Sequence, residues 1–315
     1  MKNIFCTLPN KIVLLTQYFY FYFMIFYKYC PICNSTNLKG YSIDCLRNGP
    51  HMSRVICGDC DIVFANPMAD GNDLDLFYTN YYHKGNMGIL DYTKKVLKKI
   101  QEVQSLSNEA FKKEASFIYK YKQAGRFLDV GCGLGIGLLY VDNSKFELYA
   151  TELDADALSF VQSHYHKVNT FQGELINAKY PDNYFDYVFC NHVIEHVLDP
   201  VAYVREMYRI LKDDGVLYMG TPDRKSYLYS FYRTYKFLSL SVPQIIDGIE
   251  HTFIFSKKNL SDLTLKEKFK IVSHKSIALG DSFKNIFSSN LSLKKKISRY
   301  AQTFFKVNQE LVCRK

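Results

Sequence analysis

Two pairs of cysteines near the N-terminus have the spacing of metal ligands. Each pair is a Cys-x-x-Cys motif, and 23 residues separate the two pairs. The four residues are Cys30, Cys33, Cys57 and Cys60. Two-residue spacing lets both thiolates of a pair reach one ion, and two such pairs complete a tetrahedral Zn²⁺ site. Because four protein ligands fill the coordination shell, we expect a structural zinc and not a catalytic one.

The segment between the two pairs favours a zinc ribbon. It places turn residues around short runs with β propensity. Disulfides in a secreted protein are the alternative. The nine cysteines of the chain would then leave one unpaired. An oxidising compartment would also conflict with the cytosolic chemistry considered below.

A second motif is the glycine loop, residues 129–137, which reads DVGCGLGIG. An acid is followed by four glycines at alternate positions. A chain gives up side chains at this density only where the backbone turns sharply or approaches a ligand closely. The loop does not match the dinucleotide fingerprint G-x-G-x-x-G, because Ile136 and Leu138 occupy the third glycine positions.

Two carboxylates define the ligand that would suit this loop. Glu152 lies 17 residues after Gly135, at the end of the next predicted strand, and could accept both hydroxyls of a ribose. Asp129 could hold an ammonium group, and the exposed backbone N–H groups could hold a carboxylate. No run of basic residues surrounds the loop, which disfavours a pyrophosphate. The sequence therefore favours a ligand that carries a ribose, an amino group and a carboxylate.

The elements that must position these residues alternate between strands and helices from Gly125 onward. We expect strands at 126–130, 146–153, 184–194 and 215–222. We expect helices through Leu138 and Leu139, at 154–164 with Asp154 as the N-cap, and at 200–211. This order predicts an α/β fold with an open, doubly wound parallel sheet, and a ligand at the carboxyl ends of its first strands.

Four segments in this order resemble the class I S-adenosylmethionine-dependent methyltransferases. They are FLDVGCGLGIG, ATELD, YPDNYFDYVFCNHVIEHVLDP and RILKDDGVLYMGTP. Within that class the chain is similar to the type 11 and type 23 groups that carry an N-terminal zinc ribbon. The resemblance covers about residues 28–275 and implies a Rossmann-like sheet, methyl transfer and S-adenosylmethionine as cofactor.

The resemblance also assigns roles to residues that would surround the cofactor. Those implied to line its methionine part are Asp129, Gly131, Gly133 and Gly135. Glu152 would bind the ribose, while Glu174 and Leu175 would lie beside the adenine. Asn191 and His192 would end the fourth strand of the family's sheet, here the strand expected at 184–194, and would face the sulfonium.

Three histidines are candidates for catalysis: His192, His196 and His251. Methyl transfer needs a base only where the nucleophile carries a proton that it does not lose easily, as a hydroxyl does. On a helix, His192, Glu195 and His196 would share one face and could bind a divalent cation. Quinone-precursor O-methyltransferases have such a metal site, but His192 replaces an acid there, which argues against magnesium. Alternatively, Glu195 and His196 fix the helix and loop through hydrogen bonds.

The sequence divides into five parts by composition. They are an aromatic extension (1–27), the zinc ribbon (28–68), a helical connector (69–122), the methyltransferase domain (123–280) and a basic tail (281–315). The extension has three interpretations: a signal anchor, a buried or interfacial helix, or translation that begins at Met24. An aromatic run at 227–237 is a candidate lid.

Hydrophobic residues make up 48% of the chain and charged residues 23%, which excludes a largely disordered protein. The net charge of +9 is concentrated after Lys257, where 14 Lys and Arg face 4 Asp and Glu. We expect a cytoplasmic enzyme that O- or N-methylates a small molecule, such as a sugar nucleotide or another precursor of a surface glycan or secondary metabolite.

Three alternatives stay open. The first is a lipid-linked or protein acceptor, reached through peripheral membrane contact of the basic tail. RNA is the weaker form of it, because the ribbon is only mildly charged. The others are a quinone-precursor O-methyltransferase, and a ribbon scaffold without activity.

Overall fold

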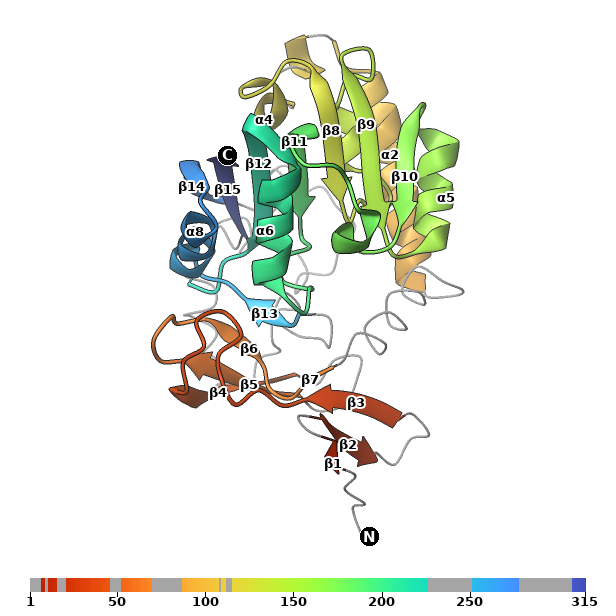
Figure 1. The fold of residues 1–315 in the computed structure, drawn as a ribbon. Coiled ribbons are helices and arrows are strands. Elements are labelled where there is room, and N and C mark those ends of the chain that lie inside the picture. Colours follow the sequence, from red (N-terminus) through yellow and green to blue (C-terminus); the bar gives the residue numbers. More distant parts are fainter. Residues whose placement is uncertain are drawn as a thin grey trace.

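A mixed sheet of seven strands forms the centre of the computed structural model, in the order β10-β9-β8-β11-β12-β15-β14 (Figure 1). Its strands are β8 (Gly125–Val130), β9 (Phe146–Glu152), β10 (Val168–Gln172), β11 (Phe185–Asn191), β12 (Leu211–Pro222), β14 (Lys270–Ile277) and β15 (Asn308–Arg314). The structure describes residues 7–8, 11–15, 21–45, 52–69, 87–107, 109–111, 115–225, 251–277 and 308–315.

The five strands from β10 to β12 are parallel, and only β15 runs against its neighbours. The chain order reverses between β8 and β11, so the carboxyl ends of these two strands open a crevice at the topological switch point. The doubly wound, Rossmann-like sheet predicted from the sequence is confirmed.

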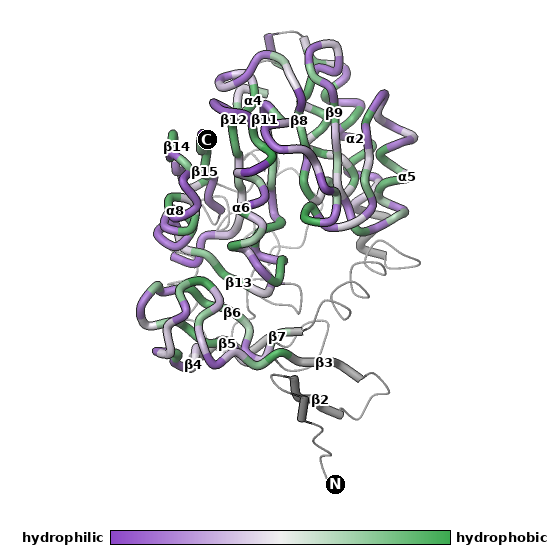
Figure 2. Tube along the Cα trace, in the orientation of Figure 1, coloured by the Kyte–Doolittle hydropathy of each residue, from purple (hydrophilic) through white to green (hydrophobic). Residues whose placement is uncertain are grey.

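Alternate residues of each inner strand face opposite cores. In β11, Tyr187 and Phe189 join the aromatic core on one face, while Val188 and Cys190 join the core on the other. Phe127 stacks on Tyr187 with ring centroids 5.3 Å apart. Figure 2 shows apolar residues along inner strands such as β11 and β12. Both faces must therefore be covered by helices.

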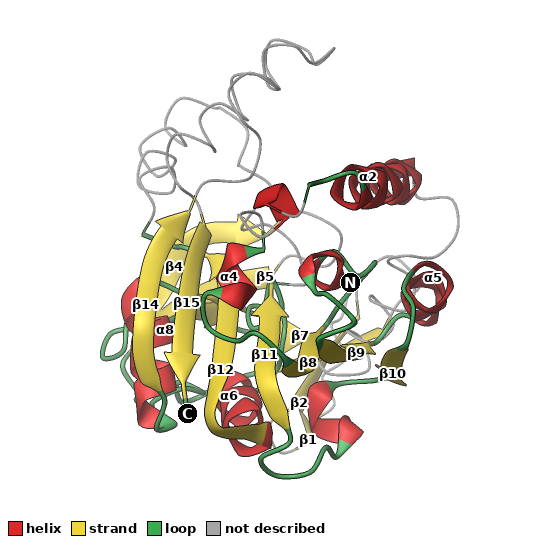
Figure 3. Ribbon diagram, turned by 90° about the horizontal axis from the view of Figure 1, so that it is seen from above, coloured by secondary structure: helices red, strands yellow, loops and turns green. Residues whose placement is uncertain are grey.

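Figure 3 shows those helices on the two sides of the sheet. On one side lie α2 (Met87–Gln104), α4 (Ser116–Tyr119) and α5 (Ala155–His164), and on the other lie α6 (Pro200–Ile210) and α8 (Lys257–Lys266). Asp154 caps α5 as predicted, accepting bonds from the N–H groups of Asp156 and Ala157. The predicted helical connector is not a detached spacer, since Val96 and Ile100 of α2 pack beside the glycine loop.

The helix expected after the glycine loop is only a 3₁₀ turn, η1 (Gly137–Tyr140). It ends because the Asp142 carboxylate accepts bonds from the backbone N–H and the hydroxyl of Ser144, which favours a turn over helix. A second 3₁₀ turn, η2 (Leu175–Ala178), follows β10.

The ribbon is an antiparallel sheet in the order β13-β6-β5-β4. Its strands are β4 (Leu38–Cys45), β5 (Met52–Cys57), β6 (Val63–Ala65) and β13 (Phe253–Ile254). The last of these comes from the C-terminal half of the chain. In Figure 1, β13 lies between the central sheet and the rest of the ribbon. The predicted ribbon boundary at residue 68 therefore omits one strand.

The helical interpretations of the aromatic extension are wrong for the residues that are described. β1 (Thr7–Leu8), β2 (Lys11–Leu15), β3 (Phe21–Ile25) and β7 (Met68–Ala69) form a four-stranded sheet. Aromatic and β-branched residues are abundant here and favour strands over helix. Among the described residues, no helix has the length and apolar character needed to cross a bilayer. A start at Met24 stays a prediction.

The C-terminal residues are not a surface tail. β15 pairs with β12 along Val216–Pro222 and with β14 on its other side. Leu311 and Cys313 enter one core, and Val312 enters the other. The predicted domain boundary at residue 280 is therefore wrong, because β15, which residues 278–307 separate from the end of β14, belongs to the same sheet. The rest of the predicted tail and the candidate lid at 227–237 lie outside the described residues.

This position of β15 predicts that Leu311→Ala lowers the free energy of unfolding by about 2–5 kcal/mol, because Leu311 is fully buried. Chemical denaturation measures the change, with Lys270→Ala on the exposed edge of β14 as the control. A solvated tail would make both variants as stable as the parent.

Candidate active site

The four cysteines meet as the ribbon requires. The sulfur atoms of Cys30 and Cys60 are 3.6 Å apart, as are those of Cys33 and Cys57, and all four lie within 4.8 Å of one another. Zn–S bonds of about 2.3 Å in a tetrahedron place sulfurs about 3.8 Å apart. The donor set and its geometry thus fit Zn²⁺.

The two Cys-x-x-Cys turns have the same backbone design. The residue four positions after the first cysteine donates its N–H to that cysteine's carbonyl, from Asn34 to Cys30 and from Asp61 to Cys57. Both residues have left-handed backbone, with φ of 61° and 62°. Asn and Asp tolerate this conformation better than other non-glycine residues, which explains their places in the sequence.

The glycine loop crosses from the end of β8 toward β9. The Cys132 N–H donates to the carbonyl of Thr151, and the Gly133 N–H donates to Glu152 Oε2 at 2.8 Å. Gly131 has φ of +62°, and a Cβ there would lie 2.6 Å from the Val193 side chain. The loop is therefore held against β9 and the turn after β11, where a larger residue would not fit.

Glu152 holds the base of this loop. Its Oε1 accepts from the N–H groups of Leu153 and Asp154 at 2.8 and 3.2 Å. Burial raises the pKa of Glu152, while the three backbone N–H groups oppose that rise. The predicted contact with a ribose stays a prediction.

Asp129 differs from Glu152 in its bonding. It is 3% exposed, and its Oδ2 has no hydrogen-bond partner among the described residues. Burial, followed by the charge of Glu152, raises the pKa of Asp129 well above its ordinary value. A buried carboxylate oxygen without a partner is costly, so a ligand that donates to it would relieve that cost.

A cavity of about 770 Å³ opens at the switch point, in front of Asp129. The lining residues that we predicted from the sequence are Asp129, Gly131, Gly133, Asn191 and His192. The other predicted residues are not part of the lining. Gly135 backs onto the Tyr165 ring, Leu175 is buried at the start of η2, and Glu174 is the N-cap of η2.

The sequence did not predict two walls of this cavity. One is aromatic, with Phe117, Phe189 and Tyr218 whose ring centroids are 4.8–5.6 Å apart. The other is polar and comes from the first residues of β15, Asn308, Gln309 and Glu310. The run of three apolar residues at 311–313 was a signal for this strand, but its neighbours in the sheet are distant in sequence.

His192 forms an ion-paired dyad with Glu195. Its Nδ1 is 3.0 Å from Glu195 Oε1, and Asn308 Nδ2 is 3.3 Å from its Nε2. Glu195 is 2% exposed, and its Oε2 accepts from the Thr221 hydroxyl. These residues form a turn and not the helix considered for them, and the strand predicted at 184–194 ends at Asn191. In this turn His192 has φ of 57° and donates its N–H to the carbonyl of Gly220.

The pKa values of the dyad follow from this contact. Burial would raise the pKa of Glu195, but the hydrogen bond from His192 and the nearby histidines lower it to about 2. Burial would lower the pKa of His192, but the hydrogen bond and charge of Glu195 outweigh burial and raise it. His192 is thus a stronger base than a free imidazole.

His196 and His251 lie behind the dyad. Their ring centroids are 4.8 Å apart, and His196 Nε2 is 3.9 Å from Glu195 Oε1. Burial, followed by the charge of His196, lowers the pKa of His251 to about 3. Neither residue lines the cavity of 770 Å³. Because both oxygens of Glu195 already accept hydrogen bonds, we interpret this cluster as support for the turn and not as a metal site.

Comparison with known proteins is consistent with this site. Residues 128–219 match the methyltransferase domain family. The chain is 35% identical over 97 residues to a Mycobacterium tuberculosis protein named a probable S-adenosylmethionine-dependent methyltransferase, and the match covers 31% of this chain and 35% of that protein. It is 35% identical over 111 residues to the ubiquinone biosynthesis O-methyltransferase of Nitrosospira multiformis, covering 33% and 46%. The chain thus spans between a third and a half of these relatives.

The fold recurs in a solved structure. A chain from the complex between the Haloferax volcanii Trm112 methyltransferase activator and a methyltransferase superposes with a TM-score of 0.53 at 12% identity. The match covers 77% of this chain and 97% of that chain. At this identity the likeness shows the fold alone.

The cysteine geometry predicts one zinc per chain. Cys33→Ser should remove the metal and lower the melting temperature, because structural zinc sites contribute directly to folding. Metal analysis and thermal denaturation measure both effects. Cys45→Ser, which changes a cysteine outside the two motifs, is the matched control. Equal zinc content in the two variants would contradict the assigned ligands.

Proposed function

We propose that this chain, which carries a class I S-adenosylmethionine-dependent methyltransferase domain, transfers a methyl group to a hydroxyl of a small molecule. The observation that carries the proposal is that the glycine loop, the unpartnered Asp129 carboxylate and His192 border one cavity. We also infer that the four cysteines hold a structural zinc.

The cofactor end of the cavity fits the ligand expected from the sequence. Asp129 Oδ2 is buried and has no hydrogen-bond partner within the described part of the chain, so it can accept a hydrogen bond from the ammonium group. The glycine at 137 leaves the space beside this carboxylate free, since a Cβ there would lie 2.6 Å from Oδ2. When bound, S-adenosylmethionine supplies an electrophilic methyl group.

His192 is positioned to remove the proton of the acceptor. Donation from Nδ1 to Glu195 leaves Nε2 as the accepting nitrogen at the cavity, where Asn308 Nδ2 lies 3.3 Å away in the position that an acceptor hydroxyl would take. Glu195 thereby fixes both the tautomer and the ring orientation. A general base is needed when the nucleophile is a hydroxyl, so the dyad favours O-methylation.

The lining favours a small acceptor of low charge. A cavity of about 770 Å³ lies within the size range of small-molecule sites, although cofactor and acceptor must share it. The aromatic wall can stack on a ring, and Asn308 and Glu310 can bond to hydroxyl groups. Among the described lining residues, Lys99 is the one Lys or Arg, and a single such cation is a poor match for a diphosphate. A nucleotide sugar is therefore less favoured than a neutral polyol or phenol.

The experiment that tests this function uses the full chain and methyl-labelled S-adenosylmethionine in an extract of the source cells. Label in small molecules supports the proposal, and their mass identifies the acceptor. Label confined to lipid, protein or RNA would overturn the small-molecule assignment, and no transfer above a control without the protein would overturn the activity.

Loss of the Asp129 charge should weaken cofactor binding. We expect Asp129→Asn to raise the Kd for S-adenosylmethionine roughly 30-fold or more, since breaking a buried charged contact costs at least about 2 kcal/mol. Calorimetry measures the Kd, and Asp213→Asn at an exposed site is the control. An unchanged Kd would show that the ammonium group binds elsewhere.

The dyad predicts a pH dependence. Because the pKa of His192 is raised, the base is neutral only at higher pH, so kcat should rise with pH through an apparent pKa above 6.5. His192→Gln should lower kcat by a factor of roughly 10²–10⁴ and remove this rise of kcat with pH, the pH limb. Glu195→Gln should move the limb to lower pH, because it removes the charge that raises the pKa. A limb unchanged in both variants would exclude His192 as the base.

A further inference from the structure

We propose that the zinc ribbon positions the His192–Glu195 dyad, and that Thr252 is the positioning residue that joins them. The inference rests on the proposed role of His192 as the base. The ribbon would then hold the base that deprotonates the acceptor, while the glycine loop would bind the cofactor.

The first step is the attachment of the ribbon to the segment 251–255. β6 pairs with β13, and the Ala65 N–H donates to the Thr252 carbonyl at 2.9 Å. Arg54 of β5 is 1% exposed, and its Nη1 donates to the His251 carbonyl at 2.6 Å. This segment is therefore a ribbon strand on one edge.

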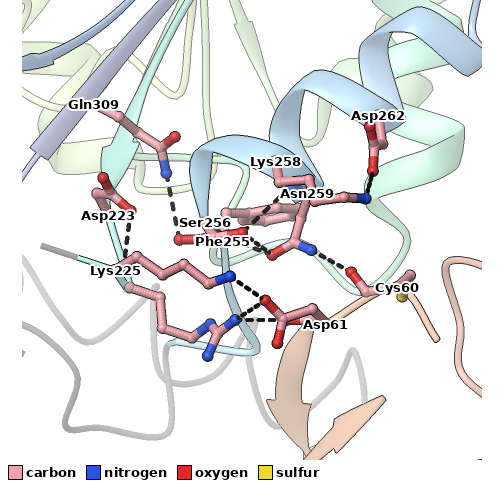
Figure 4. Close-up of polar contacts among 11 residues, drawn as sticks. Cys60, Asp61, Asp223, Lys225, Phe255, Ser256, Lys258, Asn259, Asp262 and Gln309 are labelled. Atoms are coloured by element: carbon pink, nitrogen blue, oxygen red, sulfur yellow. Dashed lines mark hydrogen bonds and ion pairs between the residues drawn. The ribbon is translucent and has the colours of Figure 1, made fainter. Parts of the chain in front are cut away.

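The metal-binding turn itself makes the second attachment. Asp61, which directly follows the ligand Cys60, pairs with Arg224 at 2.5 Å and with Lys225 at 2.7 Å. Asn259, in the first turn of α8, donates to the Cys60 carbonyl. Figure 4 shows Asp61, Lys225 and Asn259 around this turn. A change in the shape of the metal-binding turn would therefore reach the end of β12 and the start of α8.

The third step joins the segment 251–255 to the catalytic turn. The Thr252 hydroxyl donates to the carbonyls of Glu195 and Val197 at 2.9 and 2.8 Å. The Phe253 N–H also donates to the Glu195 carbonyl, at 3.1 Å. Thr252 is fully buried, so no water can replace these bonds at low cost.

The backbone of Glu195 is thus fixed by a ribbon-paired strand, while its side chain fixes His192. The cofactor side is held differently, since the glycine loop bonds to Thr151 and Glu152 of β9. Loss of the ribbon contact should therefore misplace the base and leave the cofactor site intact.

The test compares Thr252→Val with Thr264→Val. Thr264 is equally buried, and its hydroxyl also donates to two backbone carbonyls, those of Leu260 and Ser261 in α8. Each variant loses one buried hydroxyl at constant shape. We expect Thr252→Val to keep its zinc and its Kd for S-adenosylmethionine, to lower kcat at least tenfold, and to shift the pH limb. Thr264→Val should retain the kcat and the pH limb of the parent.

A second readout does not need turnover. The imidazole pKa of His192 is measured by NMR in the zinc-loaded parent, in the zinc-free parent and in both variants. Glu195 on the same turn faces His192, as do Asn308 of β15 and, beyond Glu195, His196 and His251. We expect the value to fall in zinc-free protein and in Thr252→Val, because the Glu195 contact loosens.

Equal kcat, pH limb and His192 pKa in the two variants and the parent would overturn the coupling. Changes of the same size in Thr252→Val and Thr264→Val would also overturn it, since they would reflect a general loss of stability. Full activity of His192→Gln with a shifted His192 pKa in Thr252→Val would instead refute the proposed base and retain the coupling.

Discussion

A buried carboxylate, Glu195, is the constraint on which the site depends. A charge at 2% exposure is tolerated only when every oxygen has a partner. His192 and Thr221 provide those partners, and Thr252 and Phe253 hold the backbone. The end of β11, the end of β12 and the ribbon-paired strand therefore have to converge at one point. The hydrogen bonds that this single carboxylate requires thereby fix the orientation of the His192 ring.

The hydrogen bonding of the two buried acidic residues at the switch point separates a structural carboxylate from one that is suited to bind a ligand. Both Glu195 and Asp129 are buried, but Glu195 has a partner for each oxygen and its pKa is lowered to about 2, while Asp129 has an unpartnered oxygen and a raised pKa. The first carboxylate is complete within the protein. The Asp129 carboxylate gains its missing hydrogen bond only from a ligand. The proposed ammonium site therefore rests on Asp129 and not on the number of acids nearby.

Local signals in the sequence were sufficient for four of the five parallel strands, the Asp154 cap and the glycine loop, since each depends on residues close in the chain. Pairings across the chain were not predictable in the same way. β13 meets β6 from nearly 200 residues away, and Asn308 reaches His192 across 116 positions. Residues 308–315 fell within the predicted basic tail, although the apolar run at 311–313 is compatible with a buried strand. The sequence therefore predicted the part of the cavity lining that lies at the ends of β8 and β11, from Asp129 to His192, and missed the walls that come from distant segments, such as Phe117 and residues 308–310.

The two sides of the proposed site, one for the cofactor and one for the acceptor, are stabilised in different ways. The cofactor side belongs to a parallel sheet whose strands bury both faces, so the sheet supplies its rigidity. β13 has only two residues and could not order the catalytic turn alone. A zinc site contributes roughly 10–16 kcal/mol to a small fold, which exceeds the net stability of many domains. A ribbon stabilised by zinc can thus hold β13 in place. Through β13 it can order the proposed acceptor side, which the central sheet does not do.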